Sequence, residues 1–207
     1  MMSNNHTTTL SATLFISPVE IYRFTTLLQS GIKLPVVAGT PLGIFINSLP
    51  GFDPNYISEN IQTIFLDGNA LDNLEHPLTQ SEHIVALSAA MPGLAGAIFR
   101  RNSLCAALRT QQEKPQVTDQ EKNEIIIHLK LFNSIALEKG GELLKSGGIF
   151  NGKVLSAFFQ QRPSLLDNIV SSKLGNESFS GHEFFTHLSE DKQYYFKINQ
   201  AELQESK

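Results

Sequence analysis

The sequence has 207 residues, of which 41% are hydrophobic and 17% charged, and its formal net charge is −4 at pH 7. This composition supplies apolar material for one large domain or two small ones and excludes a largely disordered chain. A nucleic-acid-binding protein concentrates lysine and arginine on one face, whereas the one basic cluster here is Arg100, Arg101 and Arg109, so we expect no nucleic-acid partner.

The first predicted element is a helix after residue 17. Ser17-Pro18-Val19-Glu20 has the order of a capping box with proline at the first helical position, and Gly31 is a natural stop. Apolar residues recur between these limits at helical spacing: Ile21, Phe24, Leu27 and Leu28. The β-branched and aromatic content of residues 14–24 leaves a strand as the alternative.

Two further helices and two strands are predicted before residue 90. Thr40-Pro41 is expected to cap a helix over 42–49, and Asp53-Pro54 opens another that extends to Ile61. Residues 63–66 then read as a strand that ends in a turn at 67–69. Residues 84–87 (Ile-Val-Ala-Leu) are the clearest buried strand of the chain.

The uncharged run 83–99 is too short for the ~20 apolar residues that span a bilayer, and Pro92, Gly93 and Gly96 interrupt it. We therefore expect a buried strand followed by a packed loop, and no membrane association. The single cysteine, Cys105, excludes an intramolecular disulfide and lies in an apolar setting, which favours a buried structural thiol. The neighbouring arginines leave a reactive thiolate as the alternative.

Residues 110–123 lack hydrophobic periodicity and are predicted to be a linker between an N-terminal domain, 1–109, and a C-terminal domain, 124–207. Residues 124–132 read as a strand, and the glycine pairs at 140–141 and 147–148 suggest turns around a second one. Further predicted elements are helices over 154–161 and 164–173 and a closing strand over 194–198.

The fold class is therefore α+β. Both halves contain a short helix, a proline break, a second helix, a glycine- or asparagine-bearing turn and a closing strand, which suggests an internal repeat. Aromatic residues crowd the last 50 positions, and we expect them mainly to fill the core of that half, with an interface role as the alternative. Residues 1–7 lack the features of a signal peptide and are expected to fray, which together with the lone thiol points to the cytoplasm.

Residues 65–72 (Phe-Leu-Asp-Gly-Asn-Ala-Leu-Asp), Pro77-Leu78 and the strand 84–87 follow one another in an order that resembles the closing half of the β-grasp sulfur carriers of thiamine and molybdopterin biosynthesis. Thr40-Pro41 resembles their helix start, and residues 125–132 resemble their opening strand. The resemblance implies one or two β-grasp-like units. The carriers act through a free C-terminal Gly-Gly, whereas Gly93 and Gly96 lie in mid-chain, so carrier chemistry would require cleavage there.

No nucleophile elbow, phosphate-binding loop or dinucleotide fingerprint occurs in the sequence. His182 and His187 are five residues apart, which places them about 140° apart on a helix, so a shared metal is not expected. Asp67, Asp72 and Glu75 surround a turn and are explained by turn chemistry and solvation, with cation binding as the alternative. We therefore expect no catalytic residue, metal or cofactor.

Three functions remain open. The first is a non-catalytic protein that acts through a protein partner or self-association. The second is a protein that binds an anionic small molecule, or an enzyme, with its site beside residues 88–101. The site residues proposed for it are Ser88, Gly93, Gly96, Arg100 and Arg101. Close backbone packing is the alternative role of the two glycines, and solvation that of the arginines. The third function is a processed sulfur carrier.

Overall fold

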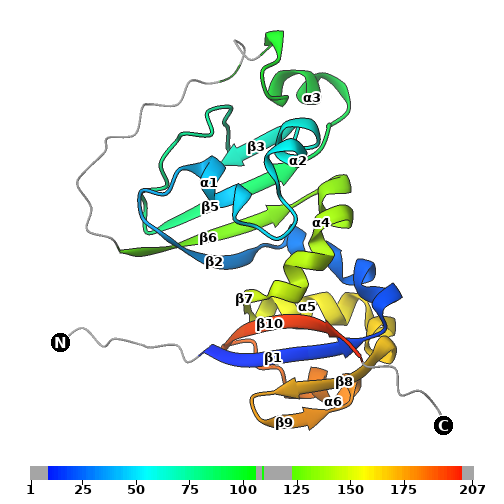
Figure 1. The fold of residues 1–207 in the computed structure, drawn as a ribbon. Coiled ribbons are helices and arrows are strands. Elements are labelled where there is room, and N and C mark those ends of the chain that lie inside the picture. Colours follow the sequence, from blue (N-terminus) through cyan, green and yellow to red (C-terminus); the bar gives the residue numbers. More distant parts are fainter. Residues whose placement is uncertain (1–8, 106–108, 110–122, 202–207) are drawn as a thin grey trace. The chain divides into compact units, whose positions relative to one another are not determined.

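The computed structural model describes residues 9–105, 109 and 123–201. The described residues form helices and mixed β-sheets, which confirms the α+β class. They divide into two units: Met1–Leu27 with Leu144–Lys207, here called unit 1, and Leu28–Leu143, here called unit 2 (Figure 1). Among these residues there is no helix whose length and hydropathy would let it cross a lipid bilayer.

The predicted division into 1–109 and 124–207 is wrong. The strand β6 (Glu124–Leu131), expected to open the second domain, pairs with β2 (Ile32–Val37) and β5 (Glu82–Ser88) of the first. The strand β1 (Thr9–Ile16) pairs instead with β10 (Gln193–Gln200), near the other end of the chain. The polar composition of 110–123 therefore marks a connection within unit 2, because strand pairing is independent of sequence distance. Residues 110–122 themselves lie outside the described residues.

Five strands of unit 2 pair in the order β2–β6–β5–β3–β4. β6 and β5 run parallel, and the other neighbouring pairs are antiparallel. Its remaining elements are α1 (Leu42–Asn47), α2 (Pro54–Glu59), β3 (Thr63–Leu66), β4 (Asn69–Ala70), α3 (Gly93–Phe99) and most of α4 (Asn133–Ser146). The predicted strands at 63–66, 84–87 and 124–132 are confirmed.

Local chemistry explains where the helices of unit 2 begin. The Asp53 carboxylate accepts the amide of Tyr56 at 2.9 Å and caps α2, as predicted. Thr40 does not cap α1: its hydroxyl donates to the carbonyl of Val37, and Pro41 occupies the N-cap position without a side-chain bond. The expected packed loop after β5 is the helix α3 instead.

Five strands of unit 1 pair in the order β7–β10–β1–β8–β9, with β10 and β1 parallel and the other pairs antiparallel. In Figure 1 the blue strand β1 and the red strand β10 lie side by side. Its remaining elements are η1 (Pro18–Gln29, a 3₁₀ helix that ends just inside unit 2), β7 (Gly148–Asn151), α5 (Gly152–Gln161), η3 (Pro163–Asn168, also 3₁₀), β8 (Ile169–Leu174), β9 (Glu177–Phe179) and α6 (Gly181–His187).

Three sequence predictions are wrong: the turn at Gly140-Gly141, the extent of the helix over 164–173 and the capping box at Ser17. Gly140 and Gly141 lie inside α4, whose buried residues keep helical spacing across them, so no turn forms there. The helix predicted over 164–173 ends at Asn168, because the residues after it form β8 between β1 and β9. Glu20 accepts from Arg23 and Asn168 instead of closing a capping box with Ser17.

The two sets of five strands share one pattern of strand directions. In the order given, each set has an antiparallel pair, then a parallel pair, then two more antiparallel pairs. Along the chain, two helices separate the first strand of each set, β2 or β7, from a two-stranded hairpin, β3–β4 or β8–β9. This agrees with the internal repeat suggested by the sequence. By their place in the chain, β7 and β10 of unit 1 correspond to β2 and β5 of unit 2. The repeat is not exact, because β10 lies beside β7, whereas β6 separates β5 from β2.

Alternation along the strands defines the core of each unit. In β6 of unit 2 the buried residues are Ile125, Ile127, Leu129 and Leu131, and the residues between them are only half buried. In unit 1 four phenylalanines meet with ring centroids 5.3–6.4 Å apart, from η1, α5 and α6: Phe24, Phe158, Phe159 and Phe184. The expectation that the aromatic residues of the last 50 positions fill the core is confirmed for Phe158, Phe159 and Phe184.

Candidate functional site

The two glycines of the predicted site belong to α3. Gly93 has a φ of +74° at the start of the helix, a conformation that favours glycine. Gly96 is buried, and a Cβ placed on it would lie 1.7 Å from the carbonyl oxygen of Met91. Gly96 is therefore required by close backbone approach, which was the alternative to a binding role.

Arg101 is occupied by the backbone of unit 2. Its Nη1 donates to the carbonyls of Ile57 and Ile61 at 3.1 and 3.3 Å, at the C-terminal end of α2. Helix C-terminal carbonyls lack intrahelical donors, and a cation there also complements the helix dipole. Burial lowers the pKa of Arg101, while the Asp72 carboxylate acts in the opposite direction. This guanidinium therefore secures a helix end and is not directed at open solvent.

The other predicted site residues do not converge with Arg101 on one cavity. The Ser88 hydroxyl is buried and accepts from the Asn133 amide at 2.9 Å. Arg100 is exposed, and its carbonyl accepts from Arg109 and from the amide of Ser103. Ser88 and Arg101 come near each other only through the backbone of Gln62, which bonds to both.

Asp72 and Arg109 hold the segment after α3 in place. Arg109 Nη1 lies 2.7 Å from the Asp72 carboxylate, Arg109 Nε donates to the carbonyl of Ile98, and the other Asp72 oxygen accepts the amide of Asn102. The interpretation of Asp72 as solvated is therefore wrong, because it is a structural partner of an arginine that is itself mostly buried.

A buried Asp67–His83 network was missed by the sequence analysis. His83 is 2% exposed; its Nδ1 lies 2.6 Å from Asp67, and its Nε2 accepts the amides of Thr79 and Gln80, each at 3.0 Å. Because Nε2 accepts two N–H groups, the ring proton is on Nδ1 and is donated to the carboxylate. Asp67 also accepts the amide of Ile84 at 2.8 Å. Neither ring nitrogen is free to act on a substrate, so the network is structural.

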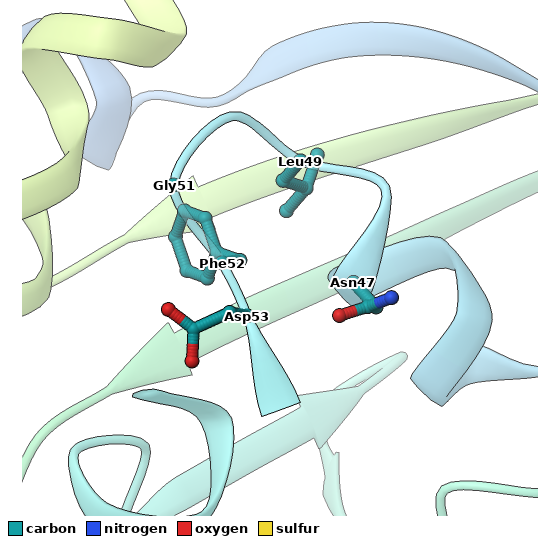
Figure 2. A pocket seen from close by; sticks show the side chains of 5 residues that line it. All are labelled: Asn47, Leu49, Gly51, Phe52 and Asp53. Atoms are coloured by element: carbon teal, nitrogen blue, oxygen red, sulfur yellow. The ribbon is translucent and has the colours of Figure 1, made fainter. Parts of the chain in front are cut away.

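A shallow pocket of about 260 Å³ opens in the connection between α1 and α2. Figure 2 shows the residues that line it, Asn47, Leu49, Gly51, Phe52 and Asp53. Its volume lies below the ~300–1,000 Å³ of typical ligand pockets. The Asp53 carboxylate is engaged in capping α2, so the pocket offers few free groups to a ligand.

Tyr56, which follows this connection, anchors α2 to α4. Its hydroxyl donates to Glu138 at 2.7 Å, and Lys139 Nζ lies 4.0 Å from the centre of its ring. Burial, followed by the hydrogen bond and the charge of Glu138, raises the pKa of Tyr56 well above its ordinary value. The phenol therefore stays protonated, and the cluster works as a link between two helices.

The remaining sequence candidates are dispersed. In α6, His182 pairs with Asp167 at 2.8 Å on the surface, while the ring of His187 stacks on Phe179. The described part of the chain contains no group of three or more histidine, cysteine or acidic residues able to hold a metal ion. Cys105 is half-buried, so the expectation of a fully buried thiol is wrong.

The unit 2 sheet has a second, outward face. Strand register places five apolar residues on it, here called the apolar patch: Pro35, Val37, Ile84, Ala86 and Ile126. Val37 and Ile84 are 52% and 46% exposed. At one corner Phe65 of β3, which is the neighbour of Ala86, contacts Phe99 at a centroid distance of 5.3 Å, so the end of α3 covers that corner.

His128 lies at the middle of this face, between Lys33 and Ile84 in the register. Its Nε2 is 3.5 Å from a carboxylate oxygen of Glu82 and has no hydrogen-bond partner among the described residues. Burial and then the charge of Lys33 lower the pKa of His128, with a smaller effect from Lys130 in the same direction and an opposing effect from Glu82.

Comparison of the chain with family models, with curated proteins and with solved structures finds no significant match. Unlike the polar groups described above, the apolar patch is left accessible by the described residues, with Val37 and Ile84 about half exposed.

Proposed function

We propose that this protein is a docking subunit without a reaction centre of its own, and that the outward face of the unit 2 sheet is its docking surface. The observation that carries this proposal is the exposure of Val37 and Ile84 on β2 and β5, which flank the strand β6, whose opposite face is buried. Contiguous apolar surface on a folded protein commonly marks a contact with another molecule, because leaving it in water costs about 25 cal/mol per Å².

The engagement of the polar candidates supports a non-catalytic role. Arg101, His83 and Asp72 each bond to groups that hold the fold, and the pocket beside Asp53 is small and open. A general acid or base needs a free nitrogen or oxygen within reach of a substrate. Among the described residues we find no such group inside a cavity.

The arrangement of unit 2 also supports a β-grasp-like module. The segments that resemble the sulfur carriers lie in one sheet: β3, the turn after it and β5 are neighbours, and β6, the counterpart of the opening strand, runs parallel beside β5. Gly96 lies within α3 and is buried. We propose a β-grasp-like scaffold that docks through its sheet, in a reducing compartment such as the cytoplasm.

Site-specific cross-linking in the cells that make the protein tests this proposal. A photoreactive amino acid at position 84 should join the chain to a protein partner. Adding Val37→Lys to this photoreactive chain should reduce the yield at least about fivefold, because an ammonium group is costly to bury. Leu137→Lys is the matched control, since Leu137 is 60% exposed on α4 and lies outside the apolar patch. Equal cross-linking in all chains, or none, would reject the docking surface.

A further inference from the structure

The identity of the docking partner, which rests on the proposed docking function, follows from the charges on the same face. Besides its apolar patch, the outward face of unit 2 carries charged side chains, which are acidic toward one end of the strands and basic toward the other. The acidic residues lie at the N-terminal half of β6. Glu124 is in β6 itself and neighbours Val37 of β2, and Glu82 of β5 neighbours Ile126. The acidic half of the face therefore also contains the exposed apolar residue Val37.

The other half of the face is basic. Lys33 neighbours His128, and Lys130, two residues further along β6, neighbours Ala86. The acidic and basic halves meet between Ile126 and His128. Each half retains apolar side chains, so the face combines a hydrophobic centre with two oppositely charged ends.

We infer that the partner is a second copy of this chain, packed sheet against sheet through this face. A two-fold axis in the plane of the interface and perpendicular to β6 reverses the strand direction of the second copy. The acidic half of each copy then lies over the basic half of the other, with Glu124 of one chain facing Lys130 of the second. A two-fold interface uses the same patch twice and must be self-complementary, which this division of charge satisfies.

A two-fold axis parallel to the strands would place Glu124 over Glu124 and Lys130 over Lys130. Like charges in apposition are unfavourable, so the charge pattern selects the reversed arrangement. In that arrangement the side chain of Ile126 lies opposite His128 of the second copy, beside the boundary between the two halves. Sheets that pack face to face in this way bury their facing side chains in a layer about 10 Å thick.

Sedimentation velocity of the purified full chain, from about 1 to 200 μM, measures the self-association. We expect a dimer whose Kd rises at least about tenfold in Ile84→Lys and less than about twofold in Leu137→Lys. Glu124→Lys and Lys130→Glu should each weaken the dimer, and the two together in one chain should restore it to within about threefold. Circular dichroism verifies that each variant is folded. A wild-type chain that is monomeric throughout this range overturns the inference.

Cysteine cross-linking tests the direction of packing in a Cys105→Ser background. Positions 124 and 130 of one strand are about 20 Å apart, at ~3.3 Å per residue, so a disulfide between them must join two chains. Glu124→Cys with Lys130→Cys should yield covalent dimers, and each single substitution should not. Cross-linking through Glu124→Cys alone would contradict the reversed arrangement.

The two proposals can fail separately. If the chain is monomeric but the probe at position 84 captures a different protein, and Val37→Lys abolishes this capture, the docking function is retained and the second copy is wrong. If the probe reacts only within its own chain, both proposals fail, since the face is then covered by the protein itself.

Discussion

The His83 network provides the sharpest test of the structure, because the described residues include two histidine–aspartate pairs in opposite environments. His83 is 2% exposed and makes three hydrogen bonds, whereas the side chains of His182 and Asp167 are 65% and 69% exposed. The nitrogen–oxygen distances of the two pairs are similar, 2.6 and 2.8 Å. Comparing the two pairs therefore separates the contribution of burial to stability from that of the pairing itself.

We expect His83→Ala to lower the free energy of unfolding by about 3–5 kcal/mol. Two neutral hydrogen bonds, from the amides of Thr79 and Gln80, contribute roughly 1 kcal/mol each, and the bond to the Asp67 carboxylate roughly 1.5–3 kcal/mol. The two amides and the carboxylate are then left without their partner. His182→Ala should cost less than about 1 kcal/mol, since an exposed pair of this kind stabilises a protein only weakly.

Urea unfolding followed by circular dichroism measures both changes. Because two units can unfold separately, amide hydrogen exchange measured by NMR supplies the reading specific to unit 2. Thr79 and Gln80 should exchange more than about tenfold faster in His83→Ala and at an unchanged rate in His182→Ala. Costs for the two variants within about 0.5 kcal/mol of each other would refute the network.

Three further predictions follow from unit 2. Arg101→Met should lower the free energy of unfolding by about 2 kcal/mol in urea titrations, because the C-terminal carbonyls of α2 lose their donor, while Arg100→Met should change it by less than about 0.5 kcal/mol. Gly96→Ala should displace α3 and cost at least about 3 kcal/mol, measured in the same way; a neutral result would show that the close contact with Met91 is wrong. His128 has a folded-state pKa below its ordinary value of about 6.5, so unfolding takes up a proton, and unit 2 should lose stability as pH falls through about 6.5. His128→Gln should make this pH profile shallower, and an identical profile would contradict the assignment.

Local chemistry was enough to predict several elements. The carboxylate of Asp53 and the following proline predicted the start of α2, and the alternation of β6 predicted a strand with one buried face. These features depend on residues within a few positions of one another. For the same reason the sequence supported an α+β class and a repeated order of helices and strands.

Strand pairing could not be predicted in this way. β1 and β10 are adjacent in space although almost the whole chain separates them, and β6 belongs to the sheet of β5 across residues 110–123. A polar, aperiodic stretch shows that a connection is present, but it does not show whether the flanking strands share a sheet. The predicted domain boundary was wrong for that reason.

The site depended even more on tertiary structure. The sequence identified Arg101 as a cation beside a glycine-bearing loop, but its partners are the carbonyls of Ile57 and Ile61, which lie 44 and 40 residues earlier in the chain. The phase of β5 indicates that His83 faces inward with its apolar neighbours, but only the fold brings Asp67 to it. The sequence by itself therefore determined which strands are apolar and where helices begin, because those properties are local. Only the tertiary structure decided which polar groups are occupied and which apolar face of the sheet remains exposed, because both depend on partners distant in the chain.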